Sequence, residues 1–120
     1  MSHSEDLSQA HELTLDMDSA QVIPAAQTSN FTGLVFRPSS DAQPGYNFVN
    51  VPVAGLGTLF IATASVTEVG PDGTPHVGAA YIYTTSVQLD VDGQFVRVFF
   101  NLDWKWPLPV FIQVIIGHAP

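Results

Sequence analysis

Hydrophobic and polar residues alternate along most of this chain, and the clearest alternation runs from Tyr81 to Trp104. The dipeptide Asp92-Gly93 lies at its middle and favours positive φ at both central positions of a two-residue hairpin turn. Side chains on a strand alternate between its two faces, so this turn predicts one nearly continuous apolar face. The predicted opposite pairs on that face are Leu89 with Val96, Val87 with Val98, Thr85 with Phe100, Tyr83 with Leu102, and Tyr81 with Trp104.

The other face of this hairpin is polar except for Phe95 and Phe99, with Ile82 near its far end. Phenylalanines on an outer face need a cover. The cover is either another part of the same chain or an interface with a second chain, and the pattern leaves both open. We also expect Gly93→Val to damage folding, because the predicted turn needs positive φ there.

Shorter alternating or apolar runs predict further strands on both sides of the hairpin. The first spans 11–18 and places Leu13, Leu15 and Met17 on one side; its pairing partner, in this chain or in another subunit, stays open. The pattern shows no amphipathic helix, so it predicts an all-β fold, an antiparallel sandwich or small closed barrel of roughly six to eight strands. The remaining strands are predicted at 31–37, 46–53, 58–69, 76–91 and 110–116, the last apolar enough to be buried on both faces.

The length of 120 residues suits one domain with its own core. Residues 1–10 are polar and acidic and predict a mobile tail, so the single β domain should span 11–120. The start of the chain lacks the basic flank and apolar core of a secretory signal, and no run approaches the roughly 18–20 apolar residues of a membrane helix. We therefore expect a cytoplasmic protein, and the scarcity of lysine suggests a GC-rich bacterial source.

Charge narrows the range of partners. Only Arg37, Arg97 and Lys105 are basic, against eleven acidic residues, and the formal net charge is −8. Phosphate backbones and anionic membranes bind clustered basic side chains, so we expect neither nucleic acid nor membrane as a partner. With 46% hydrophobic and 12% charged residues, part of the surface is expected to be an interface, with a second copy or another protein.

The sequence contains no catalytic constellation. The absence of cysteine excludes disulfides, thiolate zinc sites and cysteine nucleophiles. His76 and His118 are candidate general bases, but a histidine beside an exposed turn is usually solvated and inert. Asp90 and Asp92 superficially resemble a calcium loop, yet carboxylates that diverge from a tight hairpin cannot supply the roughly six to eight oxygens of that site. We expect no catalytic residue, no metal and no cofactor.

The segment from Trp104 to Pro109 is the most unusual local sequence. Two tryptophans separated by one residue point the same way in an extended chain, which makes a platform for a sugar or a partner. Trp104 continues the apolar face of the hairpin, so a place in the core explains it better. Trp106 stays open between the two interpretations.

Three functions fit these patterns. The favoured one is a non-catalytic binding or self-assembly module that presents an apolar β surface to itself or to a protein partner, with interface candidates Phe95, Phe99 and Ile82. The second is a small barrel with an apolar pocket that carries, cyclises or isomerises a hydrophobic small molecule by holding it in a productive conformation. The third is a carbohydrate-binding module that uses an exposed Trp106. The ligand-binding candidates for the second and third functions are Tyr81, Tyr83, Phe100, Trp104 and Trp106.

Overall fold

The computed structural model describes residues 10–22 and 30–117. Within these ranges the chain forms nine β-strands and no helix, which confirms the predicted all-β class. Two predicted strands are each divided in two, at Thr14 and near Gly78. The strands are β1 (His11–Leu13), β2 (Leu15–Val22), β3 (Phe31–Pro38), β4 (Gly45–Pro52), β5 (Ile61–Val69), β6 (Pro75–His76), β7 (Tyr81–Asp90), β8 (Phe95–Asp103) and β9 (Val110–Gly117).

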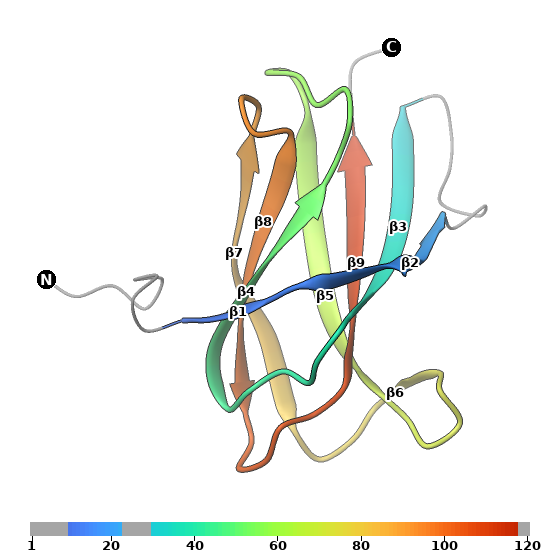
Figure 1. Ribbon diagram of the computed structural model, residues 1–120, viewed down its shortest axis with the longest axis vertical. Coiled ribbons are helices and arrows are strands. Elements are labelled where there is room, and N and C mark those ends of the chain that lie inside the picture. Colours follow the sequence, from blue (N-terminus) through green and yellow to red (C-terminus); the bar gives the residue numbers. More distant parts are fainter. Residues whose placement is uncertain (1–9, 23–29, 118–120) are drawn as a thin grey trace, which may run out of the picture.

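The strands form two sheets that pack face to face as a sandwich (Figure 1). The four-stranded sheet has the order β1-β4-β8-β7, and the five-stranded sheet has the order β2-β3-β9-β5-β6. Strand β1 pairs with β4 in parallel, and the other pairings are antiparallel. At one corner the Thr84 hydroxyl of β7 donates to the carbonyl of Ala64 in β5 at 3.3 Å, so the two sheets approach each other there.

Strands β1 and β2 are one extended segment that crosses from the first sheet to the second at Thr14. The Thr14 carbonyl accepts hydrogen bonds from the Ser39 N–H at 2.8 Å and from the Ser39 hydroxyl at 3.1 Å. Leu13 and Leu15 on either side of this crossing are both buried, whereas Met17 is exposed. The segment therefore pairs within the chain. Its predicted apolar side is buried at Leu13 and Leu15 but not at Met17.

The core lies between the sheets and is built from the inward side chains of the longer strands. Burial of each such side chain contributes about 1.5–3 kcal/mol of transfer free energy. Asn47 is the buried polar residue of the described core, and its amide donates to the carbonyls of Gln43 at 2.8 Å and Gly45 at 3.0 Å. Its role is to hold the loop before β4. The largest fully buried side chains are Phe100, Leu13, Leu102, Ile112, Val49, Val51, Val96, Val98, Val110 and Val114.

The register of the central hairpin is as predicted next to the turn and changes farther away. Leu89 pairs with Val96 and Val87 pairs with Val98, but the register shifts by one residue between Thr84 and Ser86. Beyond this bulge the pairs are Thr84 with Phe100, Tyr83 with Asn101, Ile82 with Leu102, and Tyr81 with Asp103. A bulge inserts one unpaired residue and reverses the facing of every side chain beyond it. The predicted pairs of Thr85, Tyr83 and Tyr81 are therefore wrong.

The turn of this hairpin also differs from the prediction. Asp90 and Phe95 are its last paired residues, and Gln94 rather than Gly93 has a positive φ, of 57°. A four-residue loop therefore replaces the predicted two-residue turn. Gly93 is still constrained, but for a steric reason, because a Cβ at that position would collide with the Phe95 ring.

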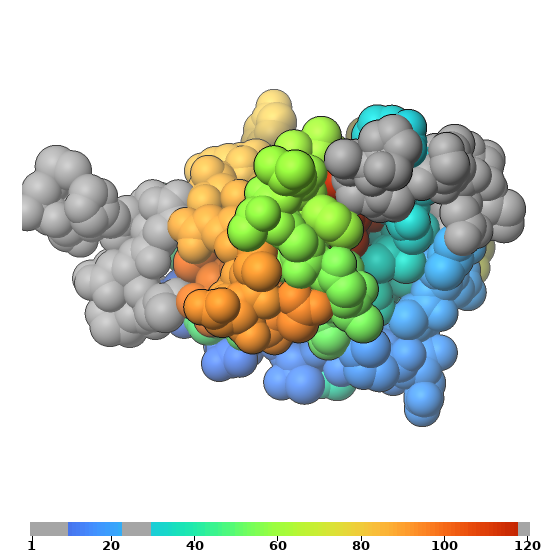
Figure 2. Space-filling model, turned by 90° about the horizontal axis from the view of Figure 1, so that it is seen from above, coloured from blue at the N-terminus to red at the C-terminus, as the bar shows by residue number. Residues whose placement is uncertain are grey.

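Gln94 ties the turn to the β4–β5 connection. Its Oε1 accepts hydrogen bonds from the backbone N–H groups of Gly55 at 2.8 Å and Leu56 at 3.0 Å. Its Nε2 donates to the carbonyls of Leu56 at 2.8 Å and Val91 at 2.7 Å. Seen from above, the orange turn packs against the green β4–β5 connection (Figure 2). These four bonds account for a non-glycine residue at positive φ, a conformation that normally costs about 1–2 kcal/mol.

The predicted burial of the last strand on both faces is wrong. β9 is the central strand of its sheet, and Val110, Ile112, Val114 and Ile116 are buried, whereas Ile115 on the opposite face is exposed. The predicted tail falls almost wholly outside the described residues. No described helix is long and apolar enough to cross a membrane.

Candidate functional site

The structure separates the residues predicted to line a ligand pocket. Phe100 is fully buried in the core, and Trp104 is half-buried against it. Tyr81 and Tyr83 are 74% and 51% exposed, because the bulge turns them to the outer face of the four-stranded sheet. Trp106 is exposed on the loop after β8. These five side chains therefore do not converge on one site.

The predicted interface residues are also separated. Ile82 packs against the core, because the bulge turns it inward. Phe99 is on the outer face as predicted, but it is buried against Phe48, with 5.7 Å between the ring centroids. Phe95 is half-buried, and Arg97 stacks on its ring.

The described residues hold no group of three or more histidines and carboxylates that could bind a metal ion. His76 is exposed next to a hairpin loop, and His118 lies outside the described ranges. In that loop the Thr74 hydroxyl donates to the Asp72 carboxylate at 2.7 Å, and this bond lowers the pKa of Asp72 below its ordinary value of 3.8. These features belong to a tight turn rather than to a catalytic centre.

An apolar surface that the sequence patterns did not predict lies on the outer face of β5 and β9. Ile61 is 66% exposed and Ile115 is 43% exposed. Leu59, two residues before Ile61, is 78% exposed. We call these three residues the outer patch; Ile61 and Ile115 lie on the face itself, and Leu59 lies in the turn that leads into β5. They include both long aliphatic side chains that point outward from the two central strands of this face.

Gly117 brings side chains from two strands together at one end of this face. It pairs with Phe31 of β3 on one side and with Ile61 of β5 on the other. A Cβ built on Gly117 would lie 2.8 Å from the Phe31 ring and 3.0 Å from the Ile61 side chain. Both side chains therefore lean over the glycine and form a continuous apolar ridge.

A groove of about 220 Å³ adjoins this ridge. Four of its lining residues face outward from the five-stranded sheet, so the groove lies on the outer face; they are Thr63, Ser65, Gln113 and Ile115. Its walls include Thr63 and Ile115, which pair directly across β5 and β9. The other lining residues are Leu34, Ala64 and Val114.

The polar groups of this face are neutral and bonded to one another. Gln113 Oε1 accepts hydrogen bonds from the Ser65 hydroxyl at 3.0 Å and from the Thr67 hydroxyl at 2.7 Å. Among the described outward residues of β3, β9 and β5, the only ionised side chain is Arg37, which stacks on the Phe111 ring at 5.2 Å. A protein of net charge −8 thus has a broad face without a carboxylate on these three strands.

A second cavity, of about 420 Å³, opens at the end of the sandwich near the Gln94 contact. It lies between the sheets, because Leu34 and Ile116 come from one sheet and Pro52 comes from the other. Its lining carries no ionisable group among the described residues. The remaining lining residues are Thr32, Val53, Ala54, Gly55 and Phe60.

The signal for the outer patch was present in the sequence. Ile61 to Ser65 alternates between small alanines and larger residues, and the alanines face the core. Large residues normally face inward, so the alternation alone assigns the wrong side.

Comparison with protein-family models, curated proteins and solved structures finds no significant match to this chain.

Proposed function

We propose that this chain is a non-catalytic self-assembly module that pairs with a second copy through the outer face of its five-stranded sheet. The observation that carries this proposal is the outer patch, Leu59, Ile61 and Ile115, beside an apolar groove on a face without carboxylates on β3, β9 and β5. Exposed apolar groups that lie together on an otherwise polar surface are typical of interaction sites.

Charge favours a second copy as the occupant. Two copies that each carry −8 repel one another wherever acidic surfaces meet. The outward residues of β3, β9 and β5 include no carboxylate, so a contact confined to these strands leaves Asp16 of the adjacent edge strand β2 outside it. A strongly basic partner would instead be drawn to the acidic parts of the surface.

The shape of the face suits a two-fold contact. The protruding ridge at Ile61 and the groove beside Thr63 lie next to each other on the same surface. In an isologous dimer the same patch is used by both subunits. The ridge of one copy can therefore enter the groove of the other, and the reverse contact forms at the same time.

The energy available from this contact suits a weak dimer. Full burial of an isoleucine contributes about 1.5–3 kcal/mol, and each patch residue is already partly covered, so about 1 kcal/mol or more remains for each. In a two-fold dimer each of the three residues is buried on both copies, which gives about 6 kcal/mol for the outer patch before its neighbours are included. Association costs offset part of this gain and burial of the neighbouring residues adds to it, so we expect a weak dimer with a dissociation constant of roughly 100 µM.

Sedimentation equilibrium of the wild type and of Ile61→Asp tests the proposal. The wild type should show reversible dimerisation, and the variant should weaken it about 100-fold or more, because a carboxylate would be buried twice in each dimer. Ile115→Lys should have the same effect although its charge is opposite, since both changes remove apolar contact.

Val77→Asp is the matched control, because Val77 is 96% exposed in the loop after β6, which pairs with the end of β5 away from Ile61. It introduces the same charge and should leave the dimer intact. A wild type that stays monomeric at several hundred micromolar contradicts the proposal. Equal weakening by Val77→Asp and Ile61→Asp would also contradict it, because charge alone would then control association.

The end cavity favours a second candidate function, the binding of an uncharged apolar small molecule. Its volume of about 420 Å³ lies within the usual range of ligand pockets, roughly 300–1,000 Å³. Ala54→Phe would fill the cavity, so it should abolish binding of an apolar fluorescent dye if the dye occupies this site. Unchanged dye binding in Ala54→Phe would reject the cavity as the site.

A further inference from the structure

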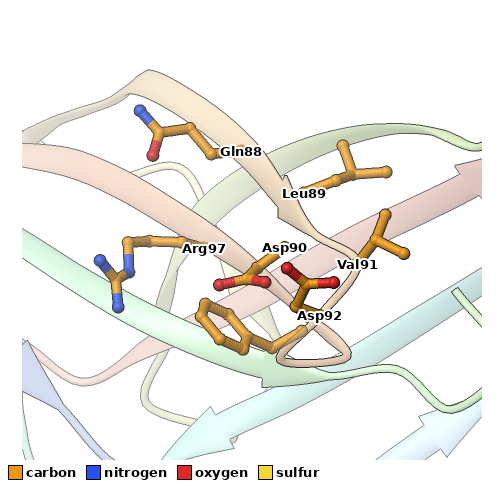
Figure 3. Close-up of a pocket in the computed structure, with 7 residues that line it drawn as sticks. Gln88, Leu89, Asp90, Val91, Asp92 and Arg97 are labelled. Atoms are coloured by element: carbon orange, nitrogen blue, oxygen red, sulfur yellow. The ribbon is translucent and has the colours of Figure 1, made fainter. Parts of the chain in front are cut away.

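The opposite side of the sandwich carries a polar pocket of about 430 Å³ beside the central hairpin. It lies on the outer face of the four-stranded sheet, away from the outer patch, and it contains Arg97, Asp90 and Asp92 (Figure 3). Both signs of charge are therefore present in one cavity. The other lining residues are Gln88, Leu89, Val91 and Phe95.

Arg97 is held in place by neighbours that leave most of its donors free. Its Nε donates to Asn50 Oδ1 on β4 at 2.7 Å. Its guanidinium carbon lies 5.1 Å from the centroid of the Phe48 ring and 5.3 Å from that of the Phe95 ring. A guanidinium has five N–H donors, so four remain on the two Nη atoms.

No carboxylate in the described part of the chain forms an ion pair with Arg97, although the protein carries eleven acidic residues. Asp90 is nearby, but its Oδ1 accepts a hydrogen bond from the Gly93 N–H at 2.7 Å and so belongs to the turn. Figure 3 shows the Arg97 guanidinium pointing away from the hairpin tip, with the Asp90 and Asp92 carboxylates beside the tip. The two kinds of charge are thus separated within the pocket.

The hairpin register sets the spacing between the backbone positions that carry these charges, which is a lower bound on the separation of the charged groups. Gln88 pairs with Arg97 and Asp90 pairs with Phe95, so the two rows lie two residues apart along the sheet. Two residues of an antiparallel strand span about 6.7 Å.

From these contacts we propose that the pocket binds a small zwitterion whose carboxylate and ammonium groups lie at least about 6–7 Å apart. The ligand carboxylate accepts hydrogen bonds from the free Nη donors of Arg97, and the ammonium lies against Asp90 and Asp92. A zwitterion has no net charge, so the −8 charge of the protein does not repel it as it would repel a simple carboxylate. An ω-amino acid and the side chain and terminus of a C-terminal lysine share this chemistry.

Titration of the full-length protein with 6-aminohexanoate, followed by isothermal calorimetry or by NMR shifts, tests the inference. Saturable binding at roughly millimolar concentration is expected. Hexanoate lacks the ammonium and hexylamine lacks the carboxylate, so each should bind at least tenfold more weakly. A peptide that ends in a free lysine and the same peptide with an amidated terminus separate the two sources of the ligand: binding of the free acid alone assigns a C-terminal lysine, and binding of neither leaves the free ω-amino acid.

Two variants locate the binding. Arg97→Met keeps an apolar stem over the rings and removes the donors, and Asp92→Asn changes an exposed carboxylate that makes no hydrogen bond or ion pair with the described residues. Each should weaken binding about tenfold, whereas Asp103→Asn, an exposed control on the other end of β8, should not. Absence of saturable binding overturns the inference. Binding that survives both variants, or hexanoate binding as tight as that of 6-aminohexanoate, overturns it as well.

Discussion

Replacement of Gln94 is the sharpest test of how the hairpin is held. The side chain makes four hydrogen bonds to backbone groups of Gly55, Leu56 and Val91. Each such bond contributes about 0.5–1.5 kcal/mol net, and water can replace the exposed one at Gly55. Gln94→Ala should therefore lower the free energy of unfolding by about 2–4 kcal/mol.

Gln94→Gly separates the hydrogen bonds from the backbone conformation. It loses the same four bonds but relieves the positive φ, so it should be about 1 kcal/mol more stable than Gln94→Ala. Urea unfolding, followed by the fluorescence of Trp104 and Trp106, measures both variants. Gln88→Ala is the control, since Gln88 is exposed and makes one long bond to Ser86, at 3.3 Å.

Two results would refute this reasoning. A loss of less than about 0.5 kcal/mol in Gln94→Ala would mean that the contact between the turn and the β4–β5 connection contributes nothing. A glycine variant less stable than the alanine variant would mean that the positive φ of Gln94 costs nothing. Either result would mean that the turn is held by its own two strands and not by the Gln94 side chain.

Two further predictions concern single side chains. The Thr85 hydroxyl is buried at the bulge and has no hydrogen-bond partner among the described residues. Thr85→Val should therefore raise the free energy of unfolding by up to about 1 kcal/mol in a urea melt. A clear loss of stability would mean that the hydroxyl is bonded. Thr74→Ala should raise the pKa of Asp72 toward 3.8 in an NMR titration, because it removes the hydroxyl that donates a hydrogen bond to the ionised carboxylate. An unchanged pKa would mean that the backbone hydrogen bonds alone lower it. Since the folded pKa is lowered, the small contribution of Asp72 to stability is present above pH 3.8 and is lost as the pH falls through the folded value.

The alternation of the chain was sufficient to predict the fold class and the hairpin next to its turn. Val87, Leu89, Val96 and Val98 alternate with polar residues, and one register alone places them on a common face. The pattern could not predict the bulge at Thr85, because shifting the register replaces Tyr83 by Ile82 on the inner face and both choices are apolar. Packing against the neighbouring sheet decides between them.

The outer patch escaped prediction for a related reason. Ile61 and Ile115 belong to strands that are apolar on both faces or have small residues on one, so their exposure depends on which face meets the other sheet. The Arg97 pocket was also hidden, since its charges come from two strands and a turn whose geometry differed from the expected one. In both cases tertiary packing determined what the local pattern left open.

In the proposed dimer, two copies meet through the outer face of the five-stranded sheet. An isotope-filtered NOE experiment on a mixture of ¹³C-labelled and unlabelled protein detects such a contact directly. We expect intermolecular contacts from the methyl groups of Ile61 and Ile115 and none from those of Val77. A dimeric sample in which these isoleucines show no intermolecular contact would contradict the proposed dimer.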